Sequence, residues 1–391
     1  MSRIAYVLTQ DKGGPVDVAV RLAHNLIDQG DDEVRVFGPT PARDADLIVG
    51  YHEPILFGSK RDGAQARELR AAIRDWAPDI VHAQDRRAGL AIVGLDRRTA
   101  SISALVHTYH GVPDDVSESW FRGERGAGGP SCYTRAVLAA DAVVARSVGA
   151  TVAPSTVMAD FLHRRLRVPR RRLVHIDNGV ALPTATPSSG PVRRLIFVGL
   201  LVPRKALLDL LSALDRPGVM PADATLTVVG DGEQRAAAEA FVTRSAIADR
   251  VEFLGFRSDV ADLIAAHDAL VLPSLMEQQP LVIAEAMGAG KMVVATDTGG
   301  VSEMLTDDGG SGFLATPGDV DDLVRQLRRL FELSDCREIS ATMIARARRR
   351  FDTGVTAQTH RALYAGLLDS RMPGSPRHCE TETTALPGGS E

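Results

Sequence analysis

The chain has 391 residues, which is longer than a usual single hydrophobic core and predicts about two domains. Its hydrophobic content of 45% and charged content of 24% are typical of globular proteins, and no segment approaches the roughly 18 unbroken apolar residues that a membrane span requires. The net charge of −5 gives no electrostatic reason to expect nucleic acid as a partner.

The N-terminus and the cysteines indicate the compartment. The first apolar run is too short for a signal peptide, since Asp11 and Lys12 follow it closely. Cys132, Cys336 and Cys379 are odd in number, widely separated and without Cys-x-x-Cys spacing, so neither a disulfide framework nor a zinc site is indicated. We therefore expect a cytoplasmic protein.

The first predicted elements are a strand at residues 4–8, a glycine turn and an amphipathic helix that follows Pro15. Strand, glycine turn and helix are the usual start of a doubly wound α/β domain. Gly13 and Gly14 in this turn would let a ligand or a facing domain approach the backbone. A turn that needs glycine only for its backbone geometry is the alternative for each of them.

Histidines follow two of the next predicted strands. A strand at residues 79–82 ends in His82, for which packing is the favoured role. The strand at 104–106 continues into His107 and His110 ahead of a glycine turn, where side chains can point into a cleft. Of these two we favour His110, and a metal pair is the alternative, although no third ligand is spaced to complete it.

The rest of the first half contains two segments of interest beside its regular elements. Residues 120–130 are rich in glycine and charge and predict an exposed, mobile loop. Residues 164–173 are strongly basic, and we favour a solvated helix end over phosphate or membrane-surface binding. The remaining predictions are a helix at 65–76, a helix at 133–140, strands at 34–37, 142–145, 151–154 and 173–176, and a helix that Ser155 caps.

The segment 183–191, rich in proline, serine and threonine, predicts a linker, after which strand, turn and helix begin again. Lys205 stands at the start of the predicted helix 206–214, where an anionic ligand would be favoured. A strand at 225–229 precedes a glycine turn that is not a dinucleotide fingerprint, because Arg235 replaces its third glycine. Ser258 is predicted to cap a helix at 260–266.

The most informative stretch is a βαβ unit with strands at 269–272 and 292–295. Pro280 is expected at the first position of its helix, which continues over 281–288. Glu285 lies in this helix among apolar residues, so it needs donors that a hydroxyl-rich ligand would supply. Glu277 lies in the loop at the helix start, where the helix N-terminus favours an anion.

The pattern Glu-x7-Glu formed by Glu277 and Glu285, behind Pro-Ser and ahead of Val-Val-Ala-Thr and Gly-Gly, resembles the nucleotide-sugar site of the retaining glycosyltransferases of family four. The resemblance implies an α/β protein of the GT-B arrangement, with two Rossmann-like domains facing a central cleft. The expected parts are an acceptor-side domain at 1–182 with a crossover helix at about 355–370, the linker 183–191, a nucleotide-sugar domain at 192–354 and a disordered tail at 371–391.

The resemblance also implies roles for single residues. Catalysis is expected from His110 and from Glu277, which meets the sugar's hydroxyls, while Glu285 meets the ribose. The donor phosphates are assigned to Gly14, Arg204 and Lys205, the sugar and base to Gln278, Gln279, Gly255, Phe256 and Arg257, and the acceptor side to Gly13, Asp17 and Tyr109. Leu200 departs from the family pattern, which has an arginine at that place.

The implied activity is retaining transfer of a hexose or amino-hexose from a UDP-sugar to a small hydroxyl acceptor, with no cofactor and no metal. A composition rich in alanine, arginine and aspartate indicates a high-GC bacterial gene and favours secondary-metabolite acceptors of the aminoglycoside kind. A nucleotide-sugar 2-epimerase, a non-catalytic binding protein, and transfer to a glycolipid or thiol precursor are the alternatives. Peripheral membrane contact is not favoured.

Overall fold

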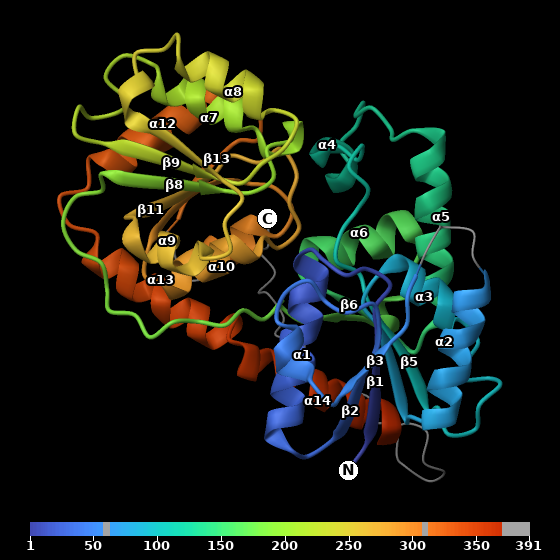
Figure 1. Cartoon of the computed structure of the whole chain (residues 1–391). Helices are drawn as coiled ribbons and strands as arrows, with labels where there is room; N and C mark the ends of the chain where they lie inside the picture. The colour runs from blue at the N-terminus through green and yellow to red at the C-terminus, as the bar shows by residue number, and fades with distance from the viewer. Residues whose placement is uncertain (58–62, 307–311, 370–391) are drawn as a thin grey trace, which may run out of the picture.

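The computed structural model describes residues 1–57, 63–306 and 312–369. They form two lobes, each a parallel sheet with helices on both faces (Figure 1). The predicted tail at 371–391 lies outside the described residues. In the described part of the chain, no helix is both long and apolar enough to cross a membrane.

The first lobe contains a seven-stranded sheet in the order β3-β2-β1-β4-β5-β6-β7. Its strands are β1 (Arg3–Val7), β2 (Glu33–Gly38), β3 (His52–Pro54), β4 (Ile80–Ala83), β5 (Ala104–Thr108), β6 (Ala150–Ala153) and β7 (Leu173–His175). Its helices are α1 (Gly14–Gln29), α2 (Gly63–Trp76), α3 (Arg86–Ile92), α4 (Glu118–Arg122), α5 (Cys132–Ser147) and α6 (Thr156–Leu166), with short 3-10 turns at Ala45–Ile48 and Arg170–Arg172. The strand order reverses between β1 and β4, which is where doubly wound sheets place their ligand crevice.

The second lobe contains a six-stranded sheet in the order β10-β9-β8-β11-β12-β13. Its strands are β8 (Arg194–Val198), β9 (Thr225–Val229), β10 (Val251–Gly255), β11 (Ala269–Leu272), β12 (Met292–Thr296) and β13 (Phe313–Ala315). Its helices are α7 (Leu207–Leu214), α8 (Arg235–Val242), α9 (Val260–Ala266), α10 (Leu281–Gly288), α11 (Val301–Leu305), α12 (Val320–Phe331) and α13 (Arg337–Arg350), with 3-10 turns at Pro203–Lys205 and Ala248–Arg250.

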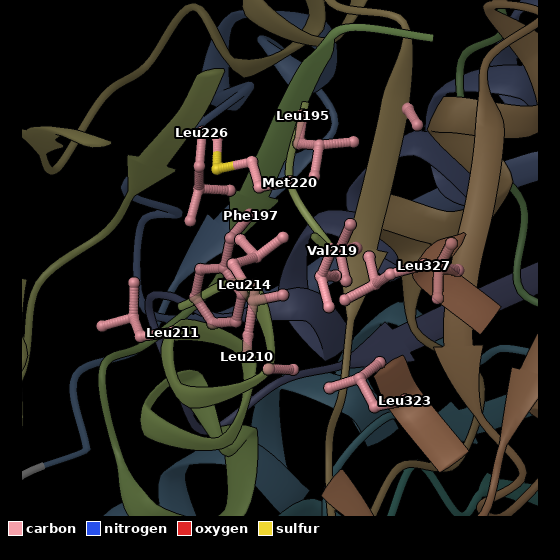
Figure 2. Packing of buried hydrophobic residues seen from close by; sticks show 14 of the residues in the cluster. Leu195, Phe197, Leu210, Leu211, Leu214, Val219, Met220, Leu226, Leu323 and Leu327 are labelled. Atoms are coloured by element: carbon pink, nitrogen blue, oxygen red, sulfur yellow. The ribbon is translucent and has the colours of Figure 1, made fainter. Parts of the chain in front are cut away.

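The core of the second lobe shows why these sequences fold as they do (Figure 2). In α7 the buried residues follow a helical spacing, with Leu207, Leu210, Leu211 and Leu214 on one face. Figure 2 shows Leu210, Leu211 and Leu214 beside Phe197 of β8, and these side chains and that of Leu207 are excluded from solvent in one cluster. Burying a leucine or phenylalanine side chain contributes about 1.5–3 kcal/mol relative to leaving it in water.

The C-terminal helix α14 (Thr353–Asp369) crosses back from the second lobe to pack on the first sheet (Figure 1). Its buried residue Tyr364 places its hydroxyl 2.6 Å from that of Tyr6 on β1 and 2.7 Å from Nδ1 of His82. Nε2 of His82 lies 2.7 Å from Oγ1 of Thr108. His82 is therefore a satisfied core histidine, as its position in the sequence indicated.

Several local predictions are wrong. Residues 142–145, predicted as a strand, belong to the single helix α5, because a short apolar run can equally be the buried face of a helix. The segment 120–130 begins inside α4, where Phe121 is buried and stacks on Phe161 with ring centroids 4.7 Å apart. Asp259, not Ser258, occupies the N-cap position of α9, and Pro280 occupies the N-cap of α10, one residue before the position predicted.

Candidate functional site

A cavity of about 620 Å³ lies between the two lobes. Its walls come from the segments that follow the carboxyl ends of β1, β4 and β5 in the first lobe and of β8 and β11 in the second. Several residues singled out from the sequence line it, namely Gly14, Tyr109, His110, Arg204, Lys205, Glu277, Gln278 and Gln279. The structure thus brings the two halves of the predicted site together around one space.

Lys205 and Glu277 form an ion pair at the second-lobe wall. Nζ of Lys205 donates to Oε1 of Glu277, and the two side chains are 12% and 8% exposed. Removing one member would leave the other as an unpaired buried charge, which is strongly unfavourable. The ammonium has three donors, so Lys205 can hold Glu277 and still donate to an anionic ligand in the cavity.

His110 faces the cavity from the first lobe, with its Nε2 3.2 Å from Oε1 of Gln84. Burial of the ring, together with the nearby His107 and His360, lowers the pKa of His110 to about 3, so the imidazole is neutral near pH 7. Because an amide oxygen only accepts, Nε2 carries the proton and Nδ1 presents a lone pair. Gln84 therefore selects the tautomer of His110.

Two buried amides in this wall have atoms without a hydrogen-bond partner within the described residues. Gln84 is 1% exposed and its Nε2 has no hydrogen bond, and Gln278 is 9% exposed with both amide atoms unpaired. Buried polar atoms normally find partners, because leaving them without one costs free energy. A ligand that carries hydroxyl groups would supply the missing partners in this cavity.

Sequence reasoning missed Gln84. It follows β4 directly, just as His107 and His110 lie at or after the end of β5, and both strands end at the same edge of the sheet. The position directly after a parallel strand next to the switch point was the signal that could have identified it.

Gln279 and Tyr109 line the cavity, but their polar atoms point to internal partners. The Gln279 amide accepts from the Asn178 N–H at 2.5 Å and donates to Oδ1 of Asp177 at 2.5 Å, which links the two lobes after β7. The Tyr109 hydroxyl donates to Oδ2 of the fully buried Asp141 at 2.9 Å, and burial raises the pKa of Tyr109. Both side chains thus hold internal partners, and their predicted contacts with the sugar and the acceptor stay predictions.

The remaining predicted residues lie outside the lining of this cavity. Gly13 precedes α1 with a φ of 109°, which favours glycine for backbone reasons. Arg257 pairs with Asp259 through Nε at 2.8 Å. Gly255, the last residue of β10, has a φ of 70°, so like Gly13 it occupies a conformation that favours glycine.

Residues 12–182 match the family model described as Glycosyltransferase Family 4, and residues 192–333 match the one described as Glycosyl transferases group 1. Together the two models match most of the chain. The chain belongs to glycosyltransferase family 4. Its membership agrees with the resemblance drawn from Glu277 and Glu285.

Curated relatives of this family 4 chain cover it in part. Glycogen synthase of Mycobacterium tuberculosis is 26% identical over 279 residues, which are 70% of this chain and 64% of that protein. The 2-deoxystreptamine glucosyltransferase of Streptomyces kanamyceticus is 32% identical over 201 residues, which are 51% of this chain and 49% of that protein. The chain thus spans between about half and two thirds of these relatives.

Solved structures agree with the fold. Anabaena HepE in complex with UDP has a TM-score of 0.74 at 21% identity and covers 94% of this chain and 100% of that one. Sucrose-phosphate synthase of Thermosynechococcus elongatus has a TM-score of 0.74 at 19% identity, covering 95% and 100%. The predicted α/β fold, two Rossmann-like domains in the GT-B arrangement, is confirmed.

Glu285, the second glutamate of the family 4 motif, does not line the cavity. The prediction that it is surrounded by apolar residues in a helix without a solvated face is wrong. The Glu285 side chain is 26% exposed, so α10 does have a partly solvated face. One guanidinium nitrogen of Arg21 on α1 lies 3.9 Å from Oε1 of Glu285. Burial raises the pKa of Glu285 and the nearby Arg21 opposes that rise. The ribose role of Glu285 stays a prediction.

First-lobe side chains also occupy the neighbourhood predicted for the base. The guanidinium of Arg43 lies 5.2 Å from the ring centroid of Phe256, whose side chain is 72% exposed. The same arginine lies 3.9 Å from Oδ2 of Asp17, and burial raises the pKa of Asp17. Asp17 is therefore engaged with Arg43 and not with the cavity at Glu277.

Leu200, which replaces the arginine of the family pattern, is 61% exposed. Nearby, Arg204 lies at the cavity wall with its Nε 3.3 Å from Oδ1 of Asp114. Lys205 and Arg204 thus supply cationic groups where the phosphates are expected. Within the described ranges, no three His, Cys, Asp or Glu side chains are grouped as a metal site would require.

Proposed function

We propose that the protein is a retaining hexosyltransferase, which moves a hexose or amino-hexose from a UDP-sugar to a hydroxyl group of a small molecule. The observation that carries the proposal is the meeting of Lys205, Glu277 and His110 around one cavity between the lobes. A volume of about 620 Å³ falls within the usual range for small-molecule sites.

In the proposed reaction the bond between the anomeric carbon and the diphosphate oxygen breaks first, and its electron pair leaves with the phosphate. Lys205, Arg204 and the N-terminus of α10 stabilise the negative charge that develops on the leaving group. The acceptor oxygen forms its bond to the same face of the sugar and gives its proton to the departing phosphate oxygen. Front-face attack of this kind retains the anomeric configuration.

The sugar ring is proposed to lie between Glu277 and His110. The Glu277 carboxylate accepts hydrogen bonds from sugar hydroxyls, and the unpaired amide of Gln278 both donates and accepts. Neutral His110 accepts a further hydroxyl hydrogen bond at Nδ1. These contacts hold the anomeric carbon against the phosphate end and contribute orientation, which lowers the barrier.

The names of the relatives support a UDP-hexose as the donor, and they leave a small molecule and a glycolipid as candidate acceptors. HepE was crystallised with UDP and with UDP-glucose, and the Streptomyces kanamyceticus relative is a 2-deoxystreptamine glucosyltransferase. These favour a UDP-hexose donor and a small acceptor such as an aminocyclitol. An Escherichia coli relative, 26% identical over 331 residues, transfers galactose to a diphosphoundecaprenol-linked sugar, which keeps a glycolipid acceptor as the second candidate. Cytoplasmic location is part of the same proposal.

The test is a thermal-shift screen of nucleotide sugars, followed by turnover of the best donor with 2-deoxystreptamine and with an undecaprenyl-diphosphate sugar. We expect UDP release that depends on the small acceptor, survives chelation of divalent metals, and gives an α-linked product from an α-linked donor. Isomerised donor without an acceptor would identify an epimerase. Binding without turnover in either arm would identify a non-catalytic binding protein.

A further inference from the structure

The short helix α4 reaches from the first lobe to the second (Figure 1). Its first residue, Glu118, has a side chain that is only 12% exposed. Oε1 of Glu118 accepts the Gly299 N–H at 2.8 Å, and Oε2 accepts the Thr298 hydroxyl at 2.9 Å. Both carboxylate oxygens are thus engaged by the loop that follows β12, and hydrogen bonds to a charged acceptor are the stronger kind.

The contact continues to the predicted sugar-binding carboxylate. Oγ1 of the fully buried Thr298 accepts the Glu277 N–H at 2.9 Å while it donates to Glu118. A hydroxyl has one proton and two lone pairs, so both bonds can exist at once. Gly299 packs so closely that an added side-chain carbon would lie 1.8 Å from the Glu277 carbonyl oxygen. The loop therefore fixes the backbone of Glu277.

A second contact between the lobes does not continue to Glu277. The Glu303 carboxylate accepts from the backbone N–H groups of Thr156 at 3.0 Å and Val157 at 2.9 Å, at the start of α6. Glu303 thus offers a matched control. It lies shortly after Thr298 and Gly299 and also joins the two lobes, but its carboxylate contacts the start of α6 and not the site.

We propose that Glu118 is a positioning residue for Glu277, and that it couples the seating of the first lobe to the placement of the sugar-binding carboxylate. Glu118 and Thr298 belong to different lobes, so separation of the lobes breaks both of these hydrogen bonds. Glu118 is not among the residues that line the cavity, so its role runs through Thr298 and Gly299. The chain of hydrogen bonds from Glu118 through Thr298 to the backbone of Glu277 is complete only while the first lobe is docked. The proposal rests on the proposed function.

The experiment compares Glu118→Ala, Thr298→Val, Thr298→Ser and Glu303→Gln with the wild type. Initial rates are measured with the best UDP-hexose and acceptor, and the Kd for UDP alone is measured by calorimetry. We expect kcat to fall on the order of tenfold to a hundredfold for E118A and T298V, because small misplacements of a site cost rate steeply. UDP lacks the sugar, so its Kd should change less than about twofold. T298S should restore most of kcat, since it keeps the hydroxyl.

The double variant E118A/T298V should be about as slow as E118A alone, because both changes cut one chain of hydrogen bonds. E303Q should lower kcat less than about threefold. The inference is overturned if E118A keeps the wild-type kcat, if E118A and E303Q lower it equally, or if UDP affinity falls in step with kcat. A wild-type protein that turns over no donor would instead overturn the proposed function. If E118A unfolds at a lower temperature but keeps its kcat, Glu118 has a structural role only, and the inference is overturned.

Discussion

Around Lys205 and Glu277 the cleft is a cavity with unpaired amides on its walls, whereas around Glu285 it is occupied by arginines of the first lobe. At the first end, the cation and the carboxylate pair with each other and remain accessible to a ligand. At the second, Arg21 contacts Glu285, and Arg43 covers Phe256. The end proposed for the sugar and phosphates is thus preformed, while the end proposed for the nucleoside would have to exchange internal contacts for ligand contacts.

The largest effect is expected at the preformed end. Lys205→Ala should lower kcat/KM on the order of a hundredfold, because the group proposed to stabilise the leaving diphosphate is lost and Glu277 loses its cationic partner. Arg204→Ala is the matched control and should cost about tenfold or less, since the ion pair of Arg204 within the described residues is with the exposed Asp114. Equal losses in steady-state rates of the two variants would contradict a special role for Lys205.

The adjacent residues Gln278 and Gln279 are expected to differ, one in donor binding and the other in the stability of the fold. Gln279→Ala should lower the free energy of unfolding by about 1–3 kcal/mol, because it removes one hydrogen bond to Asp177 and leaves the Asn178 N–H without its partner. Gln278→Ala should change stability by less than about 1 kcal/mol, because its amide has no hydrogen-bond partner within the described residues. It should raise the donor KM roughly tenfold, because this amide is proposed to bind the donor sugar. Urea unfolding and donor titrations measure both; a destabilised Q278A with normal KM would reverse the two assignments.

The two ends should also differ in their response to pH. Burial lowers the pKa of His107 and His360 to about 4 and that of His110 to about 3, against about 6.5 in the unfolded chain. Between about pH 4 and pH 6.5 the unfolded state binds more protons, so stability should fall on acidification by about 1.4 kcal/mol per pH unit for each histidine.

Glu285 has the opposite sign, because its raised pKa lets the folded state take up a proton more readily as the pH falls. Urea unfolding at about pH 7 and pH 5 checks the balance, and His360→Gln should flatten the dependence. A stability that stays constant over this range would show that these rings are not held neutral.

The smallest effect is expected at the nucleoside end. Arg21→Ala should tighten UDP binding by about threefold or less, because Arg21 and Glu285 lie 3.9 Å apart and are partly solvated, so their contact is weak. Glu285→Ala should weaken UDP binding by about tenfold if the carboxylate meets the ribose. Calorimetry with UDP measures both, and unchanged binding by E285A would remove the ribose assignment.

The sequence was most informative where nearby residues mark the ends of a helix or strand. The bounds of β11 and the end of α10 agree with the prediction, and α10 begins one residue later than predicted, because an apolar run, a proline and a glycine-rich end mark these elements. The same local reasoning failed for residues 142–145, where a buried helix face looks like a short strand.

The site was predictable in its second-lobe half and only partly in the first. Glu277 and Lys205 carry a motif, whereas Gln84 and Glu118 act through contacts that span 26 to 181 positions of the chain. The Arg21 partner of Glu285 comes from α1, so no pattern inside α10 could reveal it. Contacts between distant segments are set by the tertiary fold, which local periodicity does not encode.

A crystal structure with an intact UDP-hexose tests the account most directly. The account predicts the diphosphate against Lys205, the sugar hydroxyls on Glu277 and Gln278, and Arg21 withdrawn from a Glu285 that now holds the ribose. A donor bound elsewhere, or one seated in the cleft while Glu277 contacts no sugar atom, would contradict it.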